Sequence, residues 1–138
     1  MINRELIDPK SIVVVGGSNN VHKPGGRLVR NLLDGKYKGE LYVVNAREDD
    51  VQGLKSYHSV QDIPDTEMAI ISIPGSSCPE AVDILAKQKN VKAFIVVSAG
   101  FGEETHEGAV LENQMLDSVN EAGASMIGPN CIGLMNMN

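Results

Sequence analysis

The chain lacks several features that would place it in a specialised class of protein. It has no tryptophan, only two cysteines among 138 residues, and no run of lysine or arginine to offset its formal charge of −6. An acidic chain without a basic cluster offers no broad surface for nucleic acid or for an anionic membrane. Two cysteines do not make a disulfide framework, and the opening residues do not form a basic and then apolar leader. We therefore expect a reduced, cytoplasmic protein.

Long apolar runs are also absent. The apolar segments near Ile12, Ala69 and Ala93 are each well short of the roughly 18 residues that a membrane-spanning helix needs. What is present is an ordinary globular composition, with 42% hydrophobic and 22% charged residues. Because 138 residues is the length of one domain, we predict a single domain over residues 1–138.

Five short apolar runs divide the chain, and helical patterns lie between them. The runs are SIVVVGG, ELYVVN, EMAIISIP, KAFIVVSAG and SMIGPN. Four of them are rich in β-branched residues and nearly continuous in hydrophobicity, which is typical of strands buried on both faces of a parallel sheet. Apolar side chains at helical spacing predict helices over residues 25–35, 76–90 and 105–123. The alternation predicts an α/β fold with a doubly wound, Rossmann-like parallel sheet.

Local signals refine the boundaries of these elements. Ser77 and Glu80 have the spacing of a capping box, with Pro79 in the first helical turn, and Gly35 is suited to the C-terminus of the first helix. The segment VQGLKSYHSVQDIPD, residues 51–65, follows no clear period. We interpret it as a loop with a short helical turn.

Ligands of doubly wound folds bind beyond the carboxyl ends of the strands, so the segments that follow the strands are the candidates for a site. The first of them, GGSNN at residues 16–20, matches neither G-x-G-x-x-G nor the P-loop pattern. Backbone amides together with the side chains of Ser18, Asn19 and Asn20 are nevertheless suited to surround a phosphate. The sequence therefore predicts a phosphate-binding loop of a different type.

The second strand end discriminates between ligands. A NAD-binding domain usually has an acidic residue here for the ribose hydroxyl groups, whereas this chain has Asn45, Ala46 and Arg47. An arginine suits a ribose that carries a phosphate, as in NADP or coenzyme A. The later strand ends offer no nucleophile with a base, no carboxylate cluster and no metal-ligand spacing. We therefore predict no catalytic and no metal-binding residues.

Six segments, taken in order, resemble one known family. They are GGSNN with GGRLVRNLL, KGELYVVN, GLKSYHSVQDIP, AIISIPGSSCPE, FIVVSAGF and IGPNCIGLMN. They resemble the CoA-binding domain of the NDP-forming acyl-CoA synthetases, the group of ADP-forming acetate–CoA ligase and the α subunit of succinyl-CoA synthetase. The resemblance implies coenzyme A as the ligand. The contact residues it implies are Gly17, Ser18, Asn19, Asn20, Arg47, Ile73, Pro74, Val97, Ser98, Ala99 and Asn130.

The resemblance also implies what the parent protein does. Ligases of this family make acyl-CoA from an acid, CoA and a nucleoside triphosphate through a phosphohistidine that a second domain carries. This chain has no counterpart of that histidine, so we expect it to bind CoA as the first domain of a longer ligase and to catalyse nothing alone. The remaining ligase domains or subunit are the expected partners, and a homo-oligomer stays open.

Two alternatives to the ligase domain remain at this stage. One is an NADP- or NAD-binding Rossmann domain of an oxidoreductase or of a redox-sensing regulator, which the phosphate argument for Arg47 keeps open. The other is a stand-alone regulatory module that binds CoA without an enzyme attached. The chain also departs from the family pattern, because Arg47 stands where lysine is usual and Gly75 where alanine is common.

Overall fold

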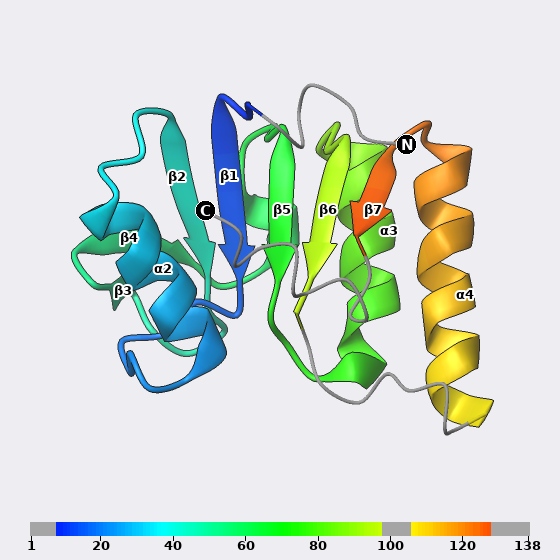
Figure 1. Cartoon of the computed structure of the whole chain (residues 1–138), viewed down its shortest axis with the longest axis horizontal. Helices are drawn as coiled ribbons and strands as arrows, with labels where there is room; N and C mark the ends of the chain where they lie inside the picture. Colours follow the sequence, from blue (N-terminus) through cyan, green and yellow to red (C-terminus); the bar gives the residue numbers. More distant parts are fainter. Residues whose placement is uncertain (1–7, 98–105, 128–138) are drawn as a thin grey trace.

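Figure 1 shows the computed structural model of the chain, which describes residues 8–97 and 106–127. In these residues seven strands form a sheet in the order β3-β4-β2-β1-β5-β6-β7. The strands are β1 (Ser11–Val15), β2 (Glu40–Val44), β3 (Asp50–Val51), β4 (Leu54–Tyr57), β5 (Met68–Ile71), β6 (Ala93–Val96) and β7 (Ser125–Ile127). The helices are α2 (Pro24–Asp34), α3 (Cys78–Gln88) and α4 (His106–Glu121), with 3₁₀ turns η1 (Val60–Asp62) and η2 (Gly75–Ser77).

The sheet is parallel except at one edge, where β3 pairs antiparallel with β4. β1 lies at the centre, and its Val14 sits between Val43 of β2 and Ile70 of β5. All four residues of β5 and of β6 are buried, as are the last four of β1. Strands that are covered on both faces need apolar side chains on both faces, which is why these segments read as continuous hydrophobic runs. The predicted doubly wound, Rossmann-like fold is confirmed.

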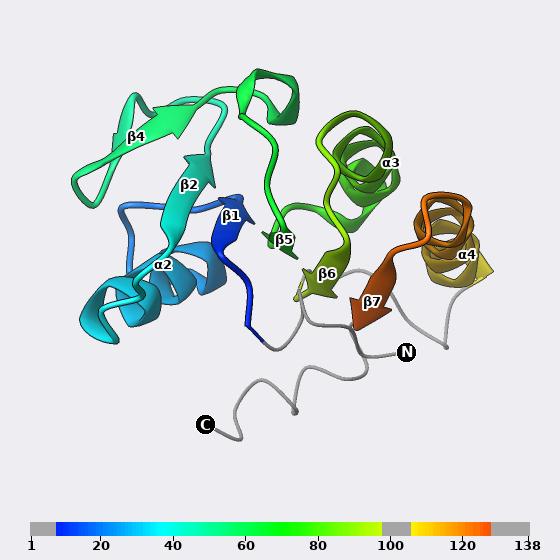
Figure 2. The same ribbon diagram turned by 90° about the horizontal axis from the view of Figure 1, so that it is seen from above.

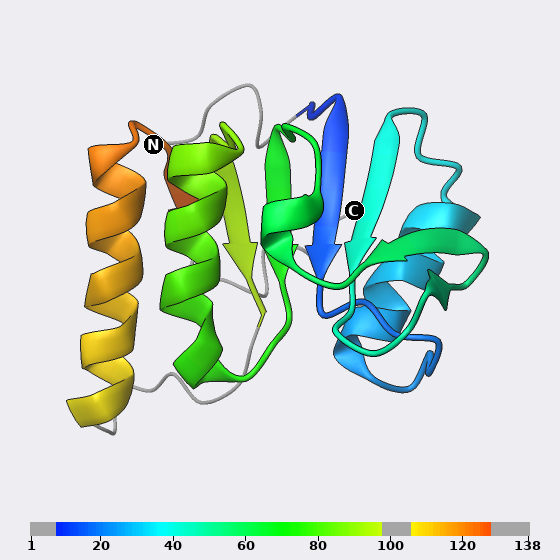
Figure 3. The same cartoon turned by 180° about the vertical axis from the view of Figure 1, so that it is seen from behind.

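Helices cover both faces of the sheet. Figure 2 shows α2 on one face, beside β1 and β2, with α3 and α4 on the other face, and Figure 3 shows α3 and α4 side by side. Val29 anchors α2 in one core cluster, whereas Val82 and Leu85 of α3 join Met115 and Val119 of α4 in the other. The helical spacing of apolar side chains that predicted the last helix thus corresponds to its buried face. Within the described residues, none of the helices combines the length and the hydropathy of a membrane span.

The prediction for residues 51–65 was only partly correct. The helical turn exists as η1, but the residues before it form a β-hairpin rather than a loop. The second strand of the hairpin, β4, extends the sheet in parallel with β2, where Val44 pairs with Tyr57. A strand of four residues, LKSY, is too short and too polar to show a period of its own. Its pairing with β2 decides its conformation, because tertiary context outweighs weak strand propensity.

Of two predicted helix ends, the one at Gly35 is confirmed and the one at Ser77 is wrong. The capping box at Ser77 does not form, because Ser77 belongs to the 3₁₀ turn η2, has helical backbone angles and makes no capping bond with its side chain. The chain thus enters α3 from a preceding turn and not from an extended residue. At the end of α2, Gly35 is the C-cap with an ordinary φ of −76°, and Lys36 takes the left-handed conformation with a φ of 54°.

Candidate ligand-binding site

A hollow of about 440 Å³ opens at the carboxyl ends of β1, β2, β4 and β5. We call it the carboxyl-end hollow. The chain leaves β1 toward β2 and β4 and then returns to β5 on the other side, so the hollow lies where the strand order reverses. This switch point is the usual ligand position in doubly wound sheets. The volume also lies within the roughly 300–1,000 Å³ of typical small-molecule sites.

The lining of this hollow is basic on one part and apolar on another. Lys23, Arg47 and His58 line it, and no Asp or Glu is among the described residues that do so. The apolar part comes from valines at the ends of β1 and β2 and from Ile73 and Pro74 after β5. A surface with this composition suits an anion that is attached to a less polar group.

The glycine loop, residues 16–20, brings the start of α2 close to β1. A β-carbon on Gly25 would overlap the carbonyl oxygen of Gly16, and one on Gly26 would overlap the carbonyl oxygen of Asn20. Both glycines are needed because backbone packs against backbone here, with no room for a side chain. The close approach places the N-terminus of α2 beside the end of β1.

The N-terminus of α2 has no side-chain cap and no negative charge in its first turn. Lys23 occupies the N-cap position. The first amide groups of a helix lack partners within the helix and carry its positive dipole end, so they attract phosphate. The ammonium group of Lys23 adds a full charge at the same place.

The polar side chains of the glycine loop mainly hold the loop itself. Ser18 Oγ accepts a hydrogen bond from the Asn20 amide at 3.0 Å, and Asn20 Oδ1 accepts one from the His22 amide at 3.0 Å. Asn19 reaches away to the hairpin, where its Nδ2 donates to the Asp50 carbonyl at 2.9 Å. Of the three predicted side chains, only Ser18 lines the hollow.

Asn45 organises the segment that carries Arg47. Its Nδ2 donates to the Gly17 carbonyl at 2.8 Å, and its Oδ1 accepts from the amides of Arg47 at 2.8 Å and Glu48 at 3.0 Å. One side chain thus ties the loop after β2 to the loop after β1. This turn fixes the backbone of Arg47, whose exposed side chain lines the hollow.

His58 approaches the hollow from the hairpin. It follows β4 directly, and its Nε2 lies 2.9 Å from Asp49 Oδ1. This contact orients the imidazole ring at the exposed rim. His58 is not among the predicted contacts, because the position of β4 beside β2 was not foreseen. Lys23 is not among them either, although a basic residue directly before Pro24 at a helix start is a signal that local sequence provides.

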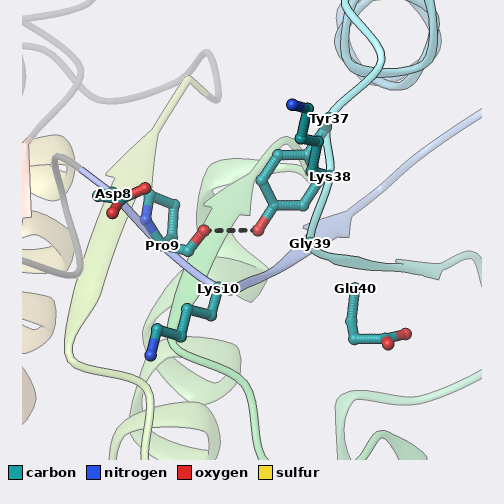
Figure 4. A pocket seen from close by; sticks show the side chains of 7 residues that line it. All are labelled: Asp8, Pro9, Lys10, Tyr37, Lys38, Gly39 and Glu40. Carbon is teal, nitrogen blue, oxygen red and sulfur yellow. Dashed lines mark hydrogen bonds between the residues drawn. The ribbon is translucent and has the colours of Figure 1, made fainter.

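A second hollow, of about 530 Å³, lies at the other end of the strands, beside the amino ends of β1 and β2 (Figure 4). We call it the amino-end hollow. Its basic residues Lys10 and Lys38 are balanced by Asp8 and Glu40. The Tyr37 hydroxyl donates to the Pro9 carbonyl at 2.7 Å. Burial raises the pKa of Tyr37 above its usual value, and nearby carboxylates, that of Glu67 first, add to this rise.

One known protein family matches nearly the whole chain. A family model described as a CoA binding domain matches residues 10–137. This chain belongs to that family. The membership that the six segments predicted is thereby confirmed.

The relatives of this CoA-binding domain are much longer proteins. The chain is 41% identical over 134 residues to ADP-forming acetate–CoA ligase II of Archaeoglobus fulgidus, covering 96% of this chain and 20% of the relative. It is 38% identical over 133 residues to the α subunit of ADP-forming acetate–CoA ligase II of Pyrococcus furiosus, covering 95% and 28%. The fold matches the apo form of the dinucleotide-forming acetyl-coenzyme A synthetase 1 of Ca. Korarchaeum cryptofilum, with a TM-score of 0.83, 34% identity and coverage of 92% and 27%.

The CoA-binding domain brings four of the predicted contact residues to the carboxyl-end hollow. They are Ser18, Arg47, Ile73 and Pro74. Gly17 is buried beside them, and a β-carbon on it would press against the side chains of Val43 and Val29. A larger residue at position 17 would therefore disturb the core as well as the loop.

The remaining predicted contacts lie elsewhere. The side chains of Asn19 and Asn20 bond to the hairpin and within the loop. Val97 follows β6, half-buried against the core cluster of the α2 face. Ser98, Ala99 and Asn130 lie outside the described residues.

Proposed function

We propose that this CoA-binding domain binds coenzyme A in the carboxyl-end hollow and serves as the first domain of an NDP-forming acyl-CoA synthetase. The observation that carries the proposal is the basic lining: Lys23 and Arg47 line the hollow, no described carboxylate does so, and the N-terminus of α2 beside it has no side-chain cap. Phosphate groups are the ligand that such an arrangement attracts. Coenzyme A carries phosphates at two separate places, on its ribose and in its diphosphate.

The two phosphate positions are proposed to lie against different elements. The N-terminus of α2, with Lys23 and the glycine loop, suits the diphosphate, because amide groups and a helix dipole act on it together. Arg47 suits the 3′-phosphate, because it follows β2, where related folds bind the ribose. The apolar residues Ile73 and Pro74 supply a surface for the uncharged part of the ligand. Val97, Ser98, Ala99 and Asn130 remain proposed contacts on the family resemblance alone.

The proposed role of the domain is binding and orientation rather than chemistry. The described residues that line the hollow include no nucleophile paired with a base. In the parent ligase an acid, CoA and a nucleoside triphosphate would give acyl-CoA through a phosphohistidine on another domain or subunit, which would be the partner of this one. The relatives support this role, since the chain spans only 20% to 28% of their length.

NADP is the ligand of the competing function, because it also carries a phosphate on its ribose. Isothermal titration of the chain with CoA, dephospho-CoA, NADP and NAD separates the two. We expect CoA to bind most tightly and dephospho-CoA to bind more weakly for want of the phosphate near Arg47. Tightest binding of NADP would overturn the proposal and favour a redox domain. If CoA binds, the length of the full natural protein separates a ligase domain from a stand-alone regulatory module.

A further inference from the structure

The β3–β4 hairpin is joined to the glycine loop by a compact set of hydrogen bonds. Gln52, at the tip of the hairpin, donates from its side-chain Nε2 to the Ser18 carbonyl at 2.9 Å and to the Gly26 carbonyl at 2.8 Å. Its backbone amide donates to Asn19 Oδ1 at 2.7 Å, and Asn19 Nδ2 returns a bond to the Asp50 carbonyl. The hairpin thus bonds to both ends of the segment from Ser18 to Gly26.

Gln52 is an unusual residue for the turn in which it stands. Gln52 and Gly53 are the two residues between β3 and β4, and both have positive φ, 50° and 89°. Positive φ at both central positions is the mark of a type I′ turn, in which asparagine followed by glycine is the preferred pair. Glutamine gains nothing from the left-handed backbone, which strains most residues other than glycine, asparagine and aspartate. Turn formation alone therefore does not explain the glutamine.

The side-chain amide of Gln52 is also incompletely bonded. Its Oε1 is buried and has no hydrogen-bond partner among the described residues. The two carbonyl acceptors on the other side fix the orientation of the amide, because only its nitrogen has hydrogens to give them. A strained backbone and an unpaired buried acceptor both disfavour this arrangement. Residues that persist in such states are held by surrounding contacts and cluster at functional sites.

We infer that Gln52 is a positioning residue that holds the glycine loop and the N-terminus of α2 in the geometry that binds phosphate, an inference that rests on the proposed function. Ser18 lines the carboxyl-end hollow, and Gly26 lies in the first turn of α2. The amide that bridges their carbonyls fixes the distance between the loop and the helix. Gln52 itself is absent from the lining of the hollow, so it acts through the loop and not by touching the ligand.

The substitution Gln52→Asn separates positioning from stability. Asparagine suits the type I′ turn better than glutamine, but its side chain is one methylene shorter and does not reach the two carbonyls. The better fit of asparagine to the turn partly offsets the loss of two hydrogen bonds, so we expect thermal stability slightly below that of the wild type, together with CoA binding that is about tenfold weaker. Gln52→Glu keeps the length but lacks the two donated hydrogens, and we expect it to weaken binding as well. Gln88→Asn, at the exposed end of α3, is the matched control and should change neither quantity.

Amide hydrogen exchange tests the inference without any ligand. In the free protein we expect the amides of Asn20, His22 and Lys23, which bond within the loop, to exchange about tenfold faster in Gln52→Asn, with the amides of β1 and β5 unchanged. Unchanged loop exchange, or CoA binding at the wild-type level in Gln52→Asn, would overturn the role of Gln52. Failure of the wild type to bind CoA would overturn the proposed function, while the exchange rates would still decide whether Gln52 holds the loop.

Discussion

The two hollows, at the amino ends and at the carboxyl ends of the strands, differ more in the charge of their linings than in size. The amino-end hollow is the larger, at about 530 Å³ against about 440 Å³, yet its lining contains two carboxylates as well as two lysines. The carboxyl-end hollow has basic residues and, among the described ones, no carboxylate in its lining. Charge balance and position in the sheet, rather than volume, therefore distinguish the candidate site.

The direction of α2 explains much of this contrast. Its N-terminus, with the positive end of the dipole, adjoins the carboxyl-end hollow through Lys23. Its C-terminus leads through Lys36 into Tyr37 and Gly39, which line the amino-end hollow. The negative end of a helix repels anions, so α2 favours phosphate in the carboxyl-end hollow and disfavours it in the amino-end hollow. In a parallel sheet with helical connections, the helices that follow the strands begin near the carboxyl ends of those strands.

A side chain at Gly25, where the start of α2 packs against the loop after β1, should have the largest effect on CoA binding. In Gly25→Ala the new β-carbon would overlap the Gly16 carbonyl oxygen, so the helix start must move away from the loop. We expect CoA affinity to fall by about 100-fold or more and the free energy of unfolding to fall by roughly 1–3 kcal/mol. Calorimetry and urea denaturation measure both. Gly35→Ala, at the other end of α2 with an ordinary φ, should bind CoA normally. Normal CoA binding by Gly25→Ala, with its fold verified by circular dichroism, would remove the glycine loop from the site.

Reversing one charge in each hollow tests the contrast directly. Arg47→Glu in the carboxyl-end hollow should weaken CoA by roughly 10- to 100-fold, because a charge-assisted bond becomes a repulsion. Dephospho-CoA should lose much less, since it lacks the phosphate assigned to Arg47. Lys38→Glu in the amino-end hollow is the control, and titration should find its CoA affinity unchanged. Equal losses for both ligands in Arg47→Glu would contradict the role of Arg47.

Removing the charge at the start of α2 should have a smaller effect. Lys23→Ala leaves the amide groups and the dipole of the helix in place, so we expect CoA to bind roughly three- to tenfold more weakly. Dephospho-CoA should weaken by the same factor, because both ligands carry the diphosphate. A loss confined to CoA would assign Lys23 to the 3′-phosphate instead.

Changing the amino-end hollow should affect stability and leave binding unaltered. Tyr37→Phe removes the hydrogen bond to the Pro9 carbonyl, and we expect the free energy of unfolding to fall by about 1 kcal/mol at pH 7. Because the pKa of Tyr37 is raised in the folded protein, the unfolded chain loses this proton first as the pH rises above about 10. The advantage of the wild type over Tyr37→Phe should therefore shrink at high pH, as denaturation curves at several pH values would reveal. Weaker CoA binding by Tyr37→Phe would break the distinction between the two hollows.

The sequence was sufficient to predict the fold class because its signals are local. The β-branched run at residues 12–15 and the stripe through Met115 and Val119 report directly which faces are buried. The glycines after β1 and the arginine after β2 likewise indicated a phosphate site, since the carboxyl ends of parallel strands share one edge. Arg47 could be placed by counting from its strand, whereas Ile73 and Pro74 were predicted from the family resemblance.

Tertiary structure alone decided which side chains of the loop face the hollow and which hold it together. Asn19 looked like a phosphate ligand, but its amide bonds to the hairpin, and the contributions of His58 and Gln52 depend on where β4 pairs. β4 has a weak strand propensity of its own, so no local sequence pattern predicts its pairing with β2. Site residues that directly follow a strand with a clear hydrophobic pattern can be predicted from the sequence. Site residues that a neighbouring strand contributes can be identified only once the strand order of the sheet is known.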